Sequence, residues 1–329
     1  MADLVTLGEA MLRLSPPCFQ RLEQANSFDV TVGGSEMNIA VASERMGLSS
    51  AFVTAVPDGP LGRMIVNKTR EHGVDTSFVI TKKNTRAGVY YLEFGAKPRA
   101  SLVVYDRADS AIAATGPGEL PWAAAFAEAR HFHTGGITPG LSDRAAQVTM
   151  EGLRAAKAAG LSTSFDLNFR ARLWTEEQSQ KVIEPMCPFI DILITTEEDT
   201  SRVFKIKGKD YEDVARQLVA KFGFKVVAIT LRENPRVWLN DWSAMALAGG
   251  KVYQAAKYEV EIVDRVGAGD SFSAGFLVGY LESGDLQKAV DFGTALSALK
   301  HSIPGDLNWS TRSEVEKLIS GGGGLRISR

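Results

Sequence analysis

The sequence has few of the residues that indicate a secreted or membrane-bound protein. Cys18 and Cys187 are its only cysteines among 329 residues, too few for a disulfide framework and typical of a reducing cytoplasm. The first residues, MADLVTLGEAML, carry an acid where a secretion signal needs positive charge. No segment approaches the roughly 20 consecutive apolar residues that span a bilayer. We therefore expect a cytoplasmic protein that does not enter a membrane.

An excess of charge of either sign is also absent. Lysine and arginine total 37 against 39 acids, so the formal net charge is −2. A nearly balanced charge gives no reason to expect nucleic acid or an anionic membrane surface as a partner. Hydrophobic residues make up 45% of the chain, which is ample for a large core. We therefore expect small molecules as the binding partners.

Histidine is scarce too, with four in the chain. His131 and His133 lie two residues apart, so on a strand they would face the same side. A metal centre built on this pair would need three or four ligands, and nothing nearby in the sequence supplies the others. We do not expect a metal ion there.

The order of apolar segments predicts an α/β fold. Short runs rich in Val, Ile and Leu alternate with longer segments of helical spacing, which favours one mostly parallel sheet with helices on both faces. Two alternating segments, residues 86–95 and 100–111, predict a hairpin that projects from this sheet. The glycine-rich end, residues 321–329, is typical of a flexible tail.

The most informative stretch is DRVGAGDSFSAGF, from Asp264 to Phe276. Small residues permit a sharp turn between a strand and a helix, and the first N–H groups of a helix are unpaired donors that attract anions. An acid such as Asp270 would repel a phosphate bound there, so it would be out of place in a loop that only binds phosphate. Its presence is explained if it accepts a proton from a hydroxyl that attacks that phosphate. The alternative is a plain strand-to-helix turn with an aspartate cap. A Walker P-loop is excluded because no G-x-x-x-x-G-K-[ST] occurs.

This stretch resembles the pattern D-T-x-G-A-G-D-x-F-x-x-G of the ribokinase-like sugar kinases, the PfkB family, and departs from it at Arg265 and Val266. The resemblance implies a three-layer α/β/α kinase domain over residues 1–320. A small β-sheet lid, with strands from about 10–32 and 86–110, would be inserted in it. The resemblance also implies ATP and Mg²⁺ as cofactors and makes a monovalent cation near Asp264 a further candidate. The implied catalytic residues are the base and the three turn residues whose N–H groups would stabilise developing charge: Asp270, Gly267, Ala268 and Gly269.

Two arginines suggest that the substrate carries an acid group. A guanidinium is the natural bidentate partner of a carboxylate or phosphate, although Arg107 and Arg170 could instead form structural ion pairs with Asp106, Asp109 or Asp166. Their surroundings, Y-x-R-x-x-S-A and D-x-N-x-R-x-x-L-W, resemble segments of 2-keto-3-deoxygluconate kinases. The resemblance, with the early motif G-G-x-x-x-N, implies these substrate-binding residues: Gly34, Asn38, Tyr90, Tyr105, Arg107, Arg170 and Asp306.

Some of these positions have plainer explanations. Gly33 and Gly34 are also typical of a tight turn before a helix. Tyr91 could point inward in place of Tyr90, because neighbouring strand residues face opposite sides. Asp306 could be an ordinary loop acid.

The nucleotide side of the pattern is less complete. The family's N-x-x-E segment appears here with Thr196 and Asp199, so Glu198 and Asp199 are candidates to hold Mg²⁺ through water, or else simply begin a solvated helix. A G-x-K-G turn that usually lies by the nucleotide is replaced by TLRENPRVWLNDWSA. The candidate nucleotide-binding residues are therefore Asn168, Thr230, Arg232, Gly267 and Gly269.

The sequence thus predicts an ATP-dependent kinase that converts 2-keto-3-deoxygluconate to its 6-phosphate. The alternatives are a fructokinase or another kinase of ketoses or galactonate-derived keto acids, and, in a different class, a non-catalytic sensor of sugar acids. The oligomeric state stays open, although an exposed lid hairpin often pairs with that of a second copy in a homodimer or higher homo-oligomer.

Overall fold

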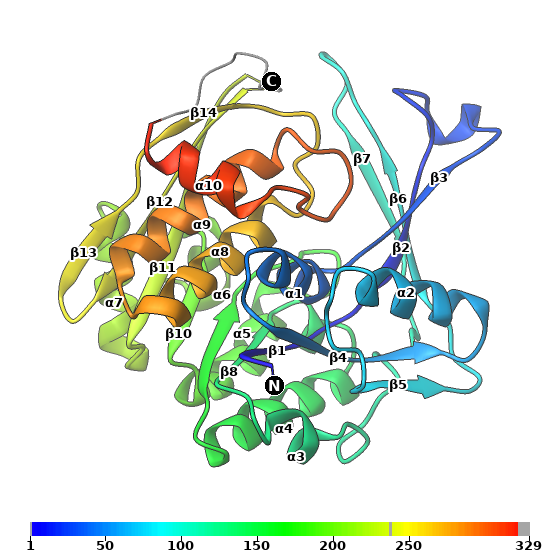
Figure 1. The fold of residues 1–329 in the computed structure, drawn as a ribbon, viewed down its shortest axis with the longest axis horizontal. Coiled ribbons are helices and arrows are strands. Elements are labelled where there is room, and N and C mark those ends of the chain that lie inside the picture. The colour runs from blue at the N-terminus through cyan, green and yellow to red at the C-terminus, as the bar shows by residue number, and fades with distance from the viewer. Residues whose placement is uncertain (1, 237–238, 322–329) are drawn as a thin grey trace.

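The computed structural model describes residues 2–236 and 239–321. For residues 232–236 it describes the backbone only. Of the predicted flexible tail, only Gly321 falls within the described residues. The described chain forms one large sheet covered by helices on both faces, and a second, smaller sheet (Figure 1). This confirms the predicted fold class. No helix in this part of the chain combines the length and the apolar character needed to cross a membrane.

The large sheet runs in the order β13-β12-β11-β10-β9-β8-β1-β4-β5, with β14 paired to β12. All pairs from β11 to β5 are parallel, and those of β12 with β11, β13 and β14 are antiparallel. The strands are β1 (Leu4–Leu7), β4 (Ser50–Pro57), β5 (Val79–Lys82), β8 (His131–Gly135), β9 (Ser162–Asp166), β10 (Ile192–Thr195), β11 (Val226–Arg236), β12 (Leu239–Ala248), β13 (Lys251–Gln254) and β14 (Tyr258–Glu261).

Two hydrophobic cores lie on the two faces of this sheet. Successive strand residues face opposite sides, so Leu4 packs in the core beneath α1, α8, α9 and α10, while Val5 packs in the core with α3 to α7. The helices are α1 (Ser35–Arg45), α2 (Pro60–Arg70), α3 (Trp122–Phe126), α4 (Asp143–Ala158), α5 (Glu176–Ile183), α6 (Glu197–Phe204), α7 (Tyr211–Phe222), α8 (Ala268–Ser283), α9 (Leu286–Lys300) and α10 (Arg312–Ile319).

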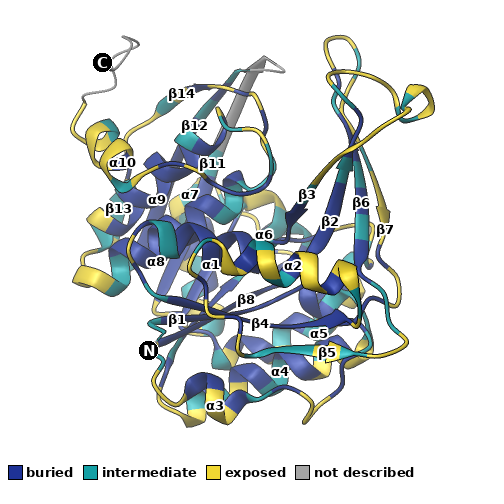
Figure 2. Cartoon of the chain, turned by 45° about the vertical axis from the view of Figure 1, so that its right-hand side comes forward, coloured by how far each residue is buried: buried dark blue, intermediate teal, exposed yellow. Residues whose placement is uncertain are grey.

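The small sheet has the order β3-β2-β6-β7 and stands away from the large one (Figure 1). It is made of β2 (Met11–Ser15), β3 (Asp29–Gly33), β6 (Gly88–Glu93) and β7 (Leu102–Asp106). The predicted hairpin is its β6–β7 pair, and the break at Gly8 and Glu9 separates β1 from β2. Its outer ends are exposed, whereas its base is buried against the body of the protein (Figure 2).

The histidine pair and the segment after Thr230 both lie in regular strands of the large sheet. His131 and His133 are fully buried on β8, where both ring nitrogens of His131 and Nδ1 of His133 lie 2.6–2.7 Å from the hydroxyls of Ser162 and Ser164. Desolvation lowers the pKa of both histidines to about 3, so both rings are neutral. Where the family usually has a G-x-K-G turn, β11 of this chain continues past Thr230 and forms a long antiparallel pair with β12.

Helices α8 and α9 touch backbone to backbone. A Cβ on Gly275 would lie 2.8 Å from the Cα of Gly293, and one on Gly293 would lie 2.8 Å from the carbonyl oxygen of Phe272. Since real Cβ atoms do not approach backbone this closely, only glycine permits the contact. The middle of α8 is thereby fixed against the middle of α9.

We expect Gly293→Ala to lower the free energy of unfolding by about 1–3 kcal/mol, because the added methyl group would force the two helices apart. Urea denaturation measures the change. Lys288→Ala, at an exposed position of the same helix, is the control and should stay within about 0.5 kcal/mol of the unmodified protein. Equal stability of the two variants would contradict the proposed contact.

Candidate active site

A cleft of about 740 Å³ lies between the base of the small sheet and the carboxyl ends of the parallel strands. Ligands of open α/β sheets bind at this edge. Most of the residues predicted from the sequence line it, namely Gly34, Asn38, Tyr90, Tyr105, Arg107, Asn168, Arg170, Glu198, Asp199, Thr230, Gly267, Gly269, Asp270 and Asp306. Two predicted residues are not among them. Ala268 is buried and its N–H donates to the carbonyl of Arg265 at 3.2 Å, and the side chain of Arg232 lies outside the described residues.

The glycine turn is shaped by close backbone contacts. Gly267 has a φ of +81°, and a Cβ there would lie 2.0 Å from the carbonyl oxygen of Asp306, so only glycine fits. A Cβ on Gly269 would meet nothing within 4 Å. The space beside Gly269 therefore belongs to the cleft, next to the first N–H groups of α8, where an anion is favoured.

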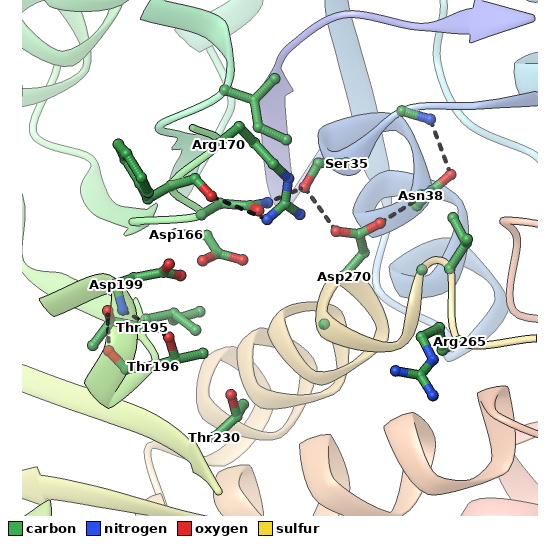
Figure 3. Close-up of a pocket in the computed structure, with 18 of the residues that line it drawn as sticks. Ser35, Asn38, Asp166, Arg170, Thr195, Thr196, Asp199, Thr230, Arg265 and Asp270 are labelled. Carbon is green, nitrogen blue, oxygen red and sulfur yellow. Dashed lines mark hydrogen bonds between the residues drawn. The ribbon is translucent and has the colours of Figure 1, made fainter. Parts of the chain in front are cut away.

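Asp270 is the third residue of α8 and points toward the first turn of α1, which it contacts directly (Figure 3). Its Oδ1 accepts from the hydroxyl of Ser35 at 2.7 Å, and its Oδ2 accepts from Nδ2 of Asn38 at 2.6 Å. Asn168 donates in turn to the Ser35 hydroxyl at 3.2 Å. Burial raises the pKa of Asp270, while the hydrogen bonds from Asn38 and Ser35 oppose this rise. The carboxylate is thus held in one orientation by neutral donors.

The amide of Asn38 is itself oriented by the chain. Its Oδ1 accepts from the N–H of Gly34 at 3.3 Å, which leaves Nδ2 directed at Asp270. A Cβ on Gly34 would lie 1.9 Å from the carbonyl oxygen of Glu9, so the glycine lets α1 begin against that segment. Glycine at this position therefore serves packing as well as the cleft.

A buried arginine that the sequence analysis did not identify connects the small sheet to the glycine turn. Arg13 on β2 is 3% exposed, and its guanidinium donates to Asp264 at 2.7 Å and to Asp306 at 3.0 Å. The hydroxyl of Tyr90 also bonds to Asp306, so Tyr90 is the tyrosine that points inward. Tyr91 instead packs against Phe28. The sequence held one signal for Arg13, since it is a single arginine on an otherwise apolar strand. Because an arginine is rarely buried without partners, such a position predicts a buried ion pair.

Arg107 and Arg170 have different surroundings. Arg107 is buried and forms an ion pair with Glu9, with 2.8 Å between its Nε and a carboxylate oxygen. The sequence allowed a structural ion pair for this arginine, but with a nearby aspartate as the partner. Arg170 is exposed to the cleft, and one of its N–H groups donates to the carbonyl of Phe169 at 3.2 Å. Within the described chain no carboxylate lies within 4 Å of its guanidinium. Arg170 is therefore the arginine with more freedom to bind an added anion.

Oxygen atoms suited to Mg²⁺ lie on the opposite wall. Asp166 ends β9 and Asp199 lies in the first turn of α6, and both face the cleft (Figure 3). Glu198 also lines the cleft, but its carboxylate is already paired with Arg202 at 2.6 Å, and its side chain is 71% exposed. The described residues contain no group of three or more acids, histidines or cysteines that could hold a metal alone. Mg²⁺ commonly binds through one or two carboxylates, water and substrate phosphates, so Asp166 and Asp199 fit it and Glu198 fits it less well.

Glu36 is a second residue that the motifs did not reveal. It lies in the first turn of α1, 1% exposed, and its Oε1 has no hydrogen-bond partner among the described residues. Desolvation, with the negative charges of Asp270 and Asp166 nearby, raises its pKa to about 8. Glu36 is therefore uncharged at neutral pH, which removes one negative charge from behind Asp270.

Comparisons with known proteins show what this chain is similar to as a whole. The model of the pfkB family of carbohydrate kinases matches residues 1–311. A 2-dehydro-3-deoxygalactonokinase from Haloferax volcanii is 39% identical over 321 residues, with 98% of each chain covered. The crystal structure of a 2-dehydro-3-deoxygluconokinase from Thermotoga maritima superposes with a TM-score of 0.94, at 43% identity over 97% of this chain and 98% of that one. An uncharacterized sugar kinase from Pyrococcus horikoshii, solved in complex with ATP, shares the fold at 22% identity, with a TM-score of 0.79 and 96% and 99% coverage.

Glu36 predicts a specific dependence of stability on pH. The folded protein keeps this proton up to about pH 8, whereas an unfolded glutamate releases it near 4.5. Between these values the unfolded state binds fewer protons, so this group lowers stability as pH rises. Glu36→Gln should remove this loss of stability. Within this pH range, the free energy of unfolding of the variant minus that of the unmodified protein should rise by about 1.4 kcal/mol per pH unit. Urea denaturation between these pH values measures it. Glu128→Gln, at an exposed position, should leave the slope unchanged, and equal slopes for both variants would disprove the assignment.

Proposed function

The chain belongs to the pfkB family of carbohydrate kinases, and we propose that it transfers the γ-phosphoryl group of ATP to a primary hydroxyl of 2-keto-3-deoxygluconate. The observation that carries the proposal is the position of Asp270. Its carboxylate faces the cleft beside the glycine turn, and two neutral donors orient it. Relatives that act on keto-deoxy sugar acids supply the substrate class.

In the proposed reaction Asp270 accepts the proton of the attacking hydroxyl. The hydroxyl oxygen then forms a bond to the γ-phosphorus, and the bond from that phosphorus to the bridging oxygen breaks to release ADP. The N–H groups at Gly267 and Gly269 stabilise the charge that develops on the transferred group. Bound Mg²⁺ would neutralise phosphate charge, with Asp166 and Asp199 on its side of the cleft. The raised pKa of Asp270 makes it a better proton acceptor than an exposed aspartate.

The acid end of the substrate binds to Arg170 in this proposal. A second cavity of about 540 Å³ is lined by Tyr105, Arg107 and Arg170, which also line the main cleft. A carboxylate in this shared region would meet the exposed guanidinium of Arg170 and the already paired guanidinium of Arg107. The site thus accepts the keto acid at one end and presents its far hydroxyl to Asp270 at the other.

The remaining sugar contacts come from residues around the base of the small sheet. Gly34, Asn38, Tyr90 and Asp306 would bind the middle hydroxyls, and the small sheet would close as a lid that excludes water from the phosphoryl group. ATP would lie along the opposite wall, near Asn168 and Thr230. The long β11–β12 pair replaces the usual turn on this side, so the contacts to the nucleotide differ in detail from the family pattern.

Replacing Asp270 tests the base. Asp270→Asn keeps the size and a hydrogen-bonding group but cannot take up the proton, so kcat should fall by about 10²–10⁴-fold with KM for the sugar acid little changed. A coupled assay of ADP release measures both constants. Near-normal turnover would refute the assignment.

Replacing Arg170 tests the substrate class. Arg170→Ala should raise KM for 2-keto-3-deoxygluconate by about 10–100-fold, because a charge-assisted pair is lost, and should change the much weaker use of fructose only slightly. The control is Arg63→Ala, at an exposed position of α2 that lines neither cavity, and it should leave both constants unchanged. If fructose is the better substrate of the unmodified protein, the proposed substrate class is wrong. Better use of the galactonate-derived acid would assign the other epimer.

A further inference from the structure

A fully buried lysine lies directly behind the glycine turn. Lys300, the last residue of α9, is 0% exposed, and its Nζ donates to the carbonyl oxygens of Asp264 at 3.2 Å and Ile303 at 2.9 Å. In the described part of the chain, no carboxylate oxygen lies within 4 Å of this ammonium. A buried lysine without a paired carboxylate is costly, since desolvation disfavours its charge and lowers its pKa. Its position therefore calls for an explanation.

The surroundings of Lys300 belong to the catalytic turn rather than to the core. A Cβ on Gly267 would lie 3.4 Å from the Cε of Lys300. The segment before the turn is also bonded to the segment after α9, with the N–H groups of Val263 and Asp264 both donating to the carbonyl of His301. The ammonium thus joins the two segments that set the position of the first N–H groups of α8.

Two backbone carbonyls directed at one point are the kind of ligands from which proteins build sites for monovalent cations. The PfkB resemblance makes such a cation near Asp264 a candidate cofactor, but the Lys300 ammonium already bonds to that carbonyl. The residues present therefore do not fit an added ion at this carbonyl.

We infer that the Lys300 ammonium is a built-in cation that positions the glycine turn, so that this kinase needs no monovalent cation. Its positive charge lies behind the turn, where it strengthens the attraction of the N–H groups for the transferred phosphoryl group. Lys300 acts through the turn and touches no substrate, so it is a positioning residue. The inference rests on the proposed role of this turn in phosphoryl transfer.

The test compares activity and thermal stability in KCl and in tetramethylammonium chloride at equal ionic strength. The unmodified protein should change by less than about twofold in kcat/KM between the two salts. Lys300→Ala should lose about 10–100-fold in tetramethylammonium chloride and regain much of this in KCl or NH₄Cl. Its melting temperature should also rise by several degrees in KCl, because the ion binds only the folded state.

Lys288→Ala is the matched control, at an exposed position of the same helix, and should respond to neither salt. Strong activation of the unmodified protein by K⁺ would overturn the inference, and this arm needs no variant. Full activity of Lys300→Ala without K⁺, or a loss of activity with no response to K⁺ in either measurement, would overturn it as well. The melting temperatures do not depend on turnover, so they separate failure of this inference from failure of the proposed function.

Discussion

The geometry of the cleft depends on one buried guanidinium. Arg13 pairs with Asp264, which precedes the glycine turn, and with Asp306, which follows α9, and all three side chains are almost fully buried. Removing either partner of such a pair leaves an uncompensated buried charge, which is strongly destabilising. Because Arg13 lies on β2, this interaction joins the small sheet to the turn. In the proposed reaction, a movement of the small sheet would therefore be transmitted to the glycine turn at the start of α8.

The site also has to bind anions beside several acids of its own. Three helices, α1, α6 and α8, begin at the cleft, and the positive ends of their dipoles favour negative charge there (Figure 3). Lys300 adds a positive charge behind the turn, and burial keeps Glu36 uncharged at neutral pH. These contributions come from backbone and from buried groups. The exposed wall of the cleft can therefore keep the carboxylates that the chemistry requires.

Much of the fold and part of the site could be predicted from local sequence. Alternation of strand-like and helical segments fixes the layers, and the turn ending in Asp270 combines backbone geometry and chemistry within a few residues. The pairs Arg107–Glu9 and Arg13–Asp264 could not be predicted, because their members lie 98 and 251 positions apart. Glu36 and Lys300 carry no motif, and only the structure shows that both are buried beside the cleft residues. The long β11–β12 pair was not predicted, because the sequence showed only that the family's G-x-K-G turn is absent there and not what replaces it.

The backbone contact between α8 and α9 has a consequence for thermal motion. Gly275 and Gly293 place no side chain at the point where the two backbones touch, so rotamer changes cannot alter the spacing of the helices at that point. Most helix pairs are separated by flexible groups that soften with temperature. At this contact the backbones meet directly, so we expect the two helices to move together there and the amide hydrogens at the contact to exchange slowly with solvent.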